Sequence, residues 1–487
     1  MLYKNNFTIL ITIILLSFIA IATFPPSIID PTDVKDFSDT AKFFAGQYKA
    51  KLRTAHSVLY GLLLSPYVKL ADSFILLKIA SAFWLSLLIL SVYYISNKNK
   101  KTLWLIITSP LIWYMSPWLS PIPLVSLLFL WAYYFIKKFD SEEKFKHLFY
   151  SGLLIGLASA LWETAFYFSF IFLLAFLYNK KLFHSILFII TVFIGMMPNL
   201  IVNQLIFNFS FYSLAKHAFA ALAFAVYGGA YNQGYSSGFM DIFMIFIFTP
   251  WYIYIIYKKE NLKEYKKELI FITISLLFIL TNPQIRLILL LIPITILMLG
   301  EKLTNKQSKI QIAIFIILSI IAITPYLIQT RYELSGTNGA SFEEIIGDLK
   351  KITLSSVFTD NLIKEDLKKI EKDYLNEIFL VGPDSDHYKH LAHLYWGDKI
   401  KEFVSIEDYN LFLENKTTIA SKKISSNSSS KFRREIWIEV GLGKNSNDNT
   451  DYENIKYAIS FDENLDLENF RLIKCYEKLC IFKNIRV

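Results

Sequence analysis

Four aspartates follow the first apolar segment of the chain, and their spacing suits acid–base chemistry. The stretch DPTDVKDFSDT (30–40) contains Asp30, Asp33, Asp36 and Asp39. Positions three apart lie on one face of a helix, so Asp33 and Asp36 form a candidate pair, in which one carboxylate takes a proton and the other orients it or holds a hydroxyl. The alternative for each aspartate is structural, as a cap of an interfacial helix that stays in water. We expect this role for Asp30 and Asp39.

A basic cluster follows the aspartates in the same loop. The stretch YKAKLRTAH (48–56) contains Lys51, Arg53 and His56, and Tyr60 comes shortly after it. Carboxylates beside cations at a membrane surface suit sugar transfer from a lipid phosphate. The acceptor hydroxyl needs a base, and the leaving phosphate needs positive charge.

Two helices are predicted to position these residues at the outer membrane interface. Segment 34–47 has apolar residues at helical spacing and charges on its other face, and segment 57–70 is apolar but too short to span a bilayer comfortably. Both therefore read as helices that lie along the headgroups.

The rest of the chain reads as a membrane protein. It has 487 residues, 54% of them hydrophobic, and a mean hydropathy of +0.40. Apolar runs predict about eleven spans. They lie at roughly 7–24, 74–96, 102–116, 122–137, 148–162, 164–179, 185–206, 239–257, 268–281, 285–300 and 310–328.

Short lysine-rich loops alternate with loops that have almost no lysine. The first set includes SNKNKK, KKFDSEEKFKH and EKLTNKQSK, and the second comprises SPWLSP, WET and TNPQIR. The positive-inside rule assigns the first set to the cytoplasm, so the aspartate loop faces outside. Much of the positive charge behind the net charge of +9 lies in these loops and is explained by membrane topology, which argues against a nucleic-acid partner.

We divide the chain into a transmembrane domain, 1–330, with a large outer loop at 25–73, and a small extracytoplasmic α/β domain, 331–487. In the second domain, EIFLVGP, a helix and IKEFVSI predict a βαβ unit, and REIWIEVGL adds a strand. A terminal hairpin turning at Glu477–Lys478 places Cys475 opposite Cys480, as a disulfide or as two buried thiols.

The order of these parts resembles the GT-C superfamily of polytopic glycosyltransferases, in particular the branch of protein O-mannosyltransferases and lipid A aminoarabinose transferases. The resembling stretches are TDVKDFSDTAKFFAGQ, AHSVLYGLLLSPYVKL, GLLIGLASALWET, GMMPNLIVNQLIFNFSFYS and NPQIRLILLLIPITILML. The resemblance implies a polyprenyl-phosphate sugar donor, Asp33 as the base, His56 and Tyr60 along a substrate path, and Lys51 or Arg53 near the phosphate. The family's acidic pair is adjacent or nearly so, whereas here the second acid is Asp36.

Three further sites have two interpretations each. Glu163, between two apolar segments, is either substrate-facing or a loop carboxylate in interfacial water. Arg286, at the outer mouth of its span, either binds lipid phosphate or snorkels. The loop with Tyr231 and Asn232 either lines an acceptor site or is a flexible outer loop.

The sequence therefore predicts a mostly α, polytopic membrane enzyme of the cell membrane. It would transfer a hexosyl or pentosyl group to a glycan, lipid or protein acceptor by inverting single displacement. We expect no cofactor and no metal, because no His, Asp or Cys set has metal-ligand spacing. The alternatives are a lipid or sugar transporter or flippase, and a non-catalytic assembly protein.

Overall fold

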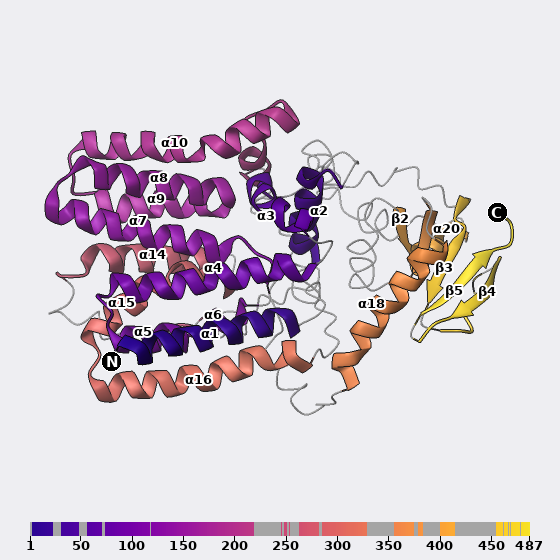
Figure 1. Cartoon of the computed structure of the whole chain (residues 1–487). Coiled ribbons are helices and arrows are strands. Elements are labelled where there is room, and N and C mark those ends of the chain that lie inside the picture. The colour runs from indigo at the N-terminus through magenta and orange to yellow at the C-terminus, as the bar shows by residue number, and fades with distance from the viewer. Residues whose placement is uncertain are drawn as a thin grey trace.

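The computed structural model describes most of the chain: residues 2–22, 31–47, 56–70, 74–116, 118–218, 245, 248–250, 253, 263–281, 285–328, 355–374, 378–382, 400–413 and 454–487 apart from 461, 466, 468 and 478. Apolar helices form a bundle around one large hydrophobic core (Figure 1). They are α1 (Leu2–Ala22), α4 (Phe74–Ile95), α5 (Lys100–Ile107), α6 (Pro110–Tyr114), α7 (Ile122–Glu142), α8 (Phe145–Leu161), α9 (Thr164–Leu177), α10 (Leu182–Phe207), α14 (Lys266–Thr281), α15 (Ile292–Lys302) and α16 (Asn305–Ile328).

The lengths and exposed side chains of the bundle helices suit a lipid bilayer. Ile122–Glu142, Leu182–Phe207 and Asn305–Ile323 are long and apolar enough to cross a membrane. The outer helices also expose large apolar side chains that water would disfavour, among them Phe193 and Ile201 on α10 and Ile317 on α16. The chain is an integral membrane protein, as predicted.

Two predicted spans are interrupted by proline. The run 102–116 divides into α5 and α6, because Pro110 cannot donate the backbone hydrogen bond that a continuous helix needs. The run 285–300 divides into a short 3₁₀ helix, η4 (Ile285–Leu290), and α15, which has Pro293 in its first turn. The predicted span at 239–257 lies almost entirely outside the described residues.

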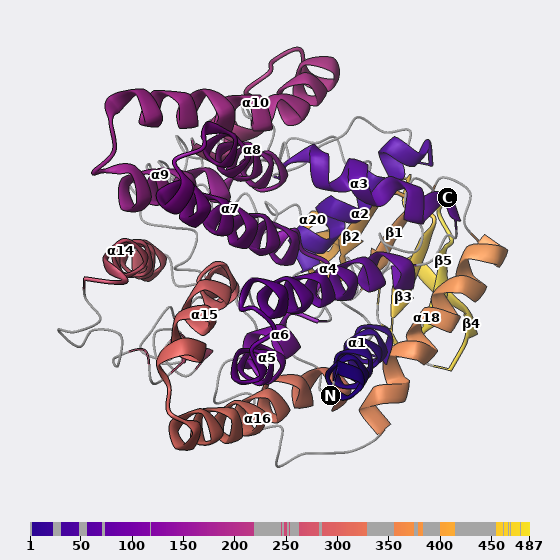
Figure 2. The ribbon, with the colours of Figure 1, turned by 60° about the vertical axis from the view of Figure 1, so that its left-hand side comes forward.

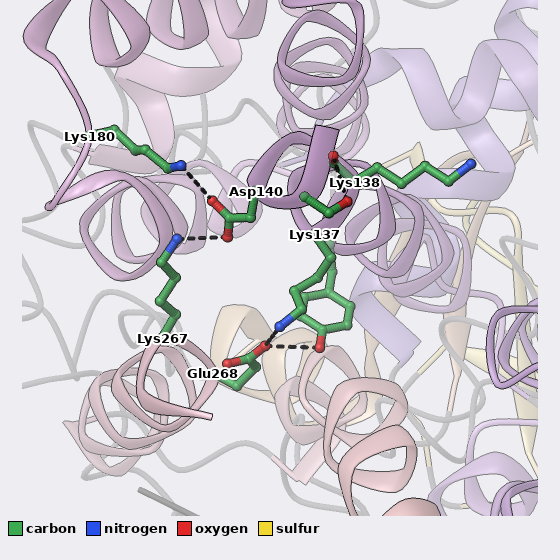
Figure 3. Close-up of polar contacts among 8 residues, drawn as sticks. Lys137, Lys138, Asp140, Lys180, Lys267 and Glu268 are labelled. Atoms are coloured by element: carbon green, nitrogen blue, oxygen red, sulfur yellow. Dashed lines mark hydrogen bonds and ion pairs between the residues drawn. The ribbon is translucent and has the colours of Figure 1, made fainter. Parts of the chain in front are cut away.

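Lysine-rich loops meet at one end of the bundle, here called the lysine pole. Asp140 at the end of α7 accepts ion pairs from Lys180, at 3.0 Å, and from Lys267, at 2.7 Å (Figure 3). Glu268, buried at the start of α14, pairs with Lys137 at 2.9 Å. Three loops that are distant in sequence are thus joined.

The remaining lysine-rich loops join the same pole. Lys302 pairs with Glu264 at 2.7 Å, and the Lys101 Nζ donates to the Leu303 carbonyl at 3.0 Å. The described parts of the lysine-rich loops therefore lie at one end of the bundle, as their alternation along the sequence predicted. That this end faces the cytoplasm stays a prediction.

The two predicted interfacial helices form at the opposite end of the bundle. They are α2 (Pro31–Ala45) and α3 (Val58–Leu70), which lie between the bundle and the C-terminal sheet (Figures 1 and 2). Phe37 and Ala41 of the predicted apolar face of α2 are buried, as expected. The expectation that Asp39 caps a helix and stays in water is wrong, because it lies inside α2 and is buried.

The C-terminal residues build a mixed sheet with the order β2-β1-β3-β5-β4. β1 is parallel to β2 and β3, and β5 is antiparallel to β3 and β4. The terminal hairpin and the parallel strands of the predicted βαβ unit are therefore present, whereas the helix predicted between those strands lies outside the described residues. The bounds are α18 (Ser355–Tyr374), β1 (Ile378–Gly382), β2 (Ile400–Ser405), α20 (Ile406–Leu413), β3 (Tyr457–Ser460), β4 (Phe470–Cys475) and β5 (Cys480–Asn484). The predicted strand REIWIEVGL lies outside the described residues.

The hairpin is closed as its sequence suggested. Cys475 and Cys480 are cross-strand partners and form a disulfide. The Tyr476 N–H donates to the Leu479 carbonyl at 2.8 Å, which leaves the cysteines as a non-hydrogen-bonded pair. The division at residue 330 and the side of the membrane on which the sheet lies stay predictions.

Candidate active site

Helices α2 and α3 cross in close contact, and this contact sets the position of the aspartates. The ring of Phe37 lies 5.2 Å from that of His56 and 5.1 Å, edge-on, from that of Tyr60. Gly61 lies directly against Thr40, so a Cβ at position 61 would overlap the Thr40 side chain. Glycine is required here by the approach of the two helices.

Asp33 and Asp36 are both part of α2, in the two turns before this crossing. Helical spacing assigns positions 33 and 36 to the side of α2 that also carries Phe37 and Thr40. Because a helix moves as a rigid unit, the fit of Thr40 against Gly61 determines where these two positions stand.

Tyr60 fixes α3 to a loop at the start of α7. Its ring is fully buried, and its hydroxyl donates to the Ser120 carbonyl at 2.9 Å. The Ser120 N–H in turn lies 3.4 Å from the Ser81 hydroxyl on α4. Tyr60 thus has a positioning contact, whereas its predicted place along a substrate path stays a prediction.

Ser57 ties the start of α3 to two other helices. Its hydroxyl lies 2.5 Å from the Ala160 carbonyl near the end of α8 and 3.0 Å from Asn199 Oδ1 on α10. His56, directly before it, therefore lies near the turn between α8 and α9. Sequence reasoning had not identified Ser57.

Glu163 lies in that turn and is only 1% exposed. This burial does not fit its alternative interpretation as a loop carboxylate in interfacial water, and its substrate-facing role stays a prediction. The N-terminus of α9 begins at the next residue and offers a favourable end of the helix dipole to a carboxylate.

Sequence reasoning missed two basic residues in this region, of which His217 lies beside the same helix end. The His217 Nε2 is 3.5 Å from the Thr164 hydroxyl, and its ring is 5.8 Å from that of Tyr167. Lys216 is buried, with its ammonium 5.4 Å above the Tyr212 ring. The signal in the sequence was a lysine–histidine pair inside the apolar stretch after α10.

Arg286 is the second residue of η4, and its guanidinium carbon lies over the Trp118 ring, 5.7 Å from the ring centroid. Trp118 belongs to the same short loop as Ser120, the partner of Tyr60. A cation–π contact of this kind holds the guanidinium beside the ring. Both interpretations of Arg286 stay predictions.

The structure thus brings His56, Tyr60, Glu163 and Arg286 to the α2–α3 end of the bundle. Lys51, Arg53, Tyr231 and Asn232 lie outside the described residues. Within the described part of the chain, no three His, Cys, Asp or Glu side chains gather as a possible metal site.

Comparison with known proteins shows the fold. No protein-family model matches the chain, and no curated protein matches it. Two crystal structures of ArnT from Cupriavidus metallidurans, one bound to undecaprenyl phosphate and one in the apo state, align over 98% of this chain and 97% of theirs, with a TM-score of 0.59. The chain has the fold of ArnT.

At 9% identity this likeness concerns the fold and not the chemistry. The predicted fold class is confirmed as a mostly helical membrane bundle with a small sheet and an ArnT-like fold. The number of spans, the superfamily and its narrower branch, which were inferred from the sequence, stay predictions.

Proposed function

We propose that the chain is a membrane glycosyltransferase that moves a sugar from a polyprenyl-phosphate donor to an acceptor at the α2–α3 end of the bundle. The observation that supports this most is the alignment with ArnT over nearly the full length of both chains. One of the two ArnT structures is bound to undecaprenyl phosphate. The acidic positions of α2 lie at one end of an apolar bundle, at the height where a lipid phosphate would stand.

The proposed reaction is a single displacement. Asp33 takes the proton of the acceptor hydroxyl while the oxygen attacks the anomeric carbon of the sugar. The bond from that carbon to the phosphate oxygen breaks, and its electron pair leaves with the polyprenyl phosphate, so the anomeric centre inverts. A base in this position contributes about 10²–10⁴-fold in rate.

The other predicted residues have supporting roles in this proposal. Asp36 orients the acceptor hydroxyl or holds a sugar hydroxyl. Lys51, Arg53 and Arg286 neutralise the leaving phosphate, as cations do for developing charge in a site with little water. His56 and Glu163 contact the sugar, and Tyr231 and Asn232 contact the acceptor. The proposed reaction uses neither a cofactor nor a metal ion.

The test is glycosyl transfer from a panel of polyprenyl-phosphate sugars by the full-length protein in membranes. We expect Asp33→Asn to lose at least about 10²-fold in rate while protein level and lipid binding persist. Asp30→Asn, which removes the same charge from the same loop, is the matched control and should keep its activity.

Full activity in Asp33→Asn and Asp36→Asn alike would refute the assignment of the base. If no donor is turned over and the protein instead moves lipid between leaflets, the transporter alternative replaces this proposal. Activity in neither assay would favour the assembly-protein alternative.

A further inference from the structure

The lysine pole carries more positive charge than its acids neutralise. Asp140 and Glu268 are occupied by Lys180, Lys267 and Lys137 (Figure 3). Figure 3 also shows Lys138 extending away from both acids, although it is the neighbour of Lys137.

Three lysines near the ends of α4, α7 and α8 have no ion pair in the described part of the chain: Lys98, Lys138 and Lys146. Lys98 and Lys146 are exposed, and Lys138 is partly exposed. Glu142, four residues from both Lys138 and Lys146, is already bonded to Lys144 and to His147. Their charge is available to a partner from outside the chain.

An aromatic patch lies next to these lysines on the surface of the bundle. The patch consists of Tyr94 on α4, Trp131, Tyr134 and Phe135 on α7, and Tyr150 on α8. Consecutive ring centroids are 6.1 Å apart from Tyr94 to Trp131, 5.4 Å from Trp131 to Tyr134, and 5.3 Å from Phe135 to Tyr150. Tyr94 is 59% exposed and Tyr150 is 44% exposed, so the patch is a surface.

Helix geometry relates the lysines to the patch. Lys138 follows Tyr134 by four residues on α7, and Lys146 precedes Tyr150 by four on α8, which runs the other way. Four residues of helix rise about 6 Å, so these two lysines stand about one turn closer to the pole than the rings. Lys138 confirms this relation, since its ammonium is 4.9 Å from the Tyr134 ring centroid. Lys98 lies in the turn that follows the end of α4 at Ile95, four residues after Tyr94.

We propose that this surface binds the headgroup of an anionic phospholipid, with the phosphate at Lys98, Lys138 and Lys146 and the glycerol and upper acyl chains on the aromatic patch. The charge is complementary to a phosphodiester, and tyrosine and tryptophan favour the level of the headgroups. The surface is also continuous with the apolar faces that meet lipid. This site is independent of the proposed transfer reaction at the other end of the bundle.

The experiment uses the full-length protein in phosphatidylcholine vesicles that contain either brominated phosphatidylglycerol or brominated phosphatidylcholine at the same mole fraction. Bromine quenches tryptophan fluorescence at contact. The difference between wild type and Trp131→Phe isolates the signal of the patch. We expect this signal to be quenched more strongly by the anionic lipid.

The combined variant Lys98→Gln, Lys138→Gln and Lys146→Gln should lose that preference, by about fivefold for each lysine, because a lysine near an anionic surface contributes about 1 kcal/mol. The control removes three exposed lysines of the same pole, at positions 181, 306 and 309, and should keep the preference. Equal quenching of wild-type Trp131 by both lipids would overturn the proposal, and so would an equal loss in both combined variants.

Discussion

Replacing Gly61 by alanine tests whether the crossing of α2 and α3 positions the reaction. The added Cβ would overlap the Thr40 methyl group, and it would lie 2.5 Å from the Thr40 Cβ and 3.1 Å from its backbone carbonyl carbon. Carbon atoms in ordinary contact are about 3.5–4.0 Å apart. Relief therefore requires α2 to move away from α3 by about 1 Å, because the Thr40 Cβ is attached to the backbone and cannot rotate aside.

The expected result has two parts. Overpacking of this kind lowers the free energy of unfolding by about 1–3 kcal/mol. The same displacement carries Asp33 and Asp36 with α2, and a misplacement of about 1 Å costs about 10²-fold in rate. We therefore expect a folded protein with about 10²-fold lower transfer activity, measured with a polyprenyl-phosphate donor per mole of folded enzyme.

Gly152→Ala is the matched control. Gly152 on α8 also lies directly against a threonine, Thr191 on α10, but this contact is in the middle of the bundle, away from α2. It should lose comparable stability and keep its activity. The reasoning is refuted if Gly61→Ala is as active as wild type, or if Gly152→Ala loses activity to the same extent.

Three further predictions concern stability. Tyr60→Phe leaves the buried Ser120 carbonyl without its donor and should lower the free energy of unfolding by about 1–3 kcal/mol, measured by chemical denaturation in detergent. Lys137→Ala removes the ion pair of Glu268, whose carboxylate is buried while the lysine is 43% exposed. We expect the free energy of unfolding to fall by about 1–3 kcal/mol. Adding Glu268→Gln to the same chain should reduce this loss, because the buried charge is then removed as well. Cys475→Ser opens a hairpin loop with a sequence separation of 5, and loop-closure entropy predicts a loss of about 2 kcal/mol, seen as faster hydrogen exchange in β4 and β5, whereas unchanged exchange would contradict it.

The sequence by itself determined the elements that depend on local pattern. Apolar runs and lysine-rich loops fixed which segments are helices and which loops share a pole, because every backbone polar group in a bilayer must be bonded within its own segment. The period of apolar residues predicted α2. The spacing of the last two cysteines about a two-residue turn predicted their pairing.

Tertiary structure decided the contacts between segments that are distant along the chain. The hydroxyl of Ser57 meets Ala160 and Asn199, and the Tyr60 hydroxyl meets Ser120, and no periodicity in the sequence specifies such a pair. The burial of Glu163 was likewise missed, because exposure at the end of a helix depends on what packs over it. Local patterns fix which residues form a helix, whereas the packing of whole helices fixes which of their ends meet and hence which polar groups share a site.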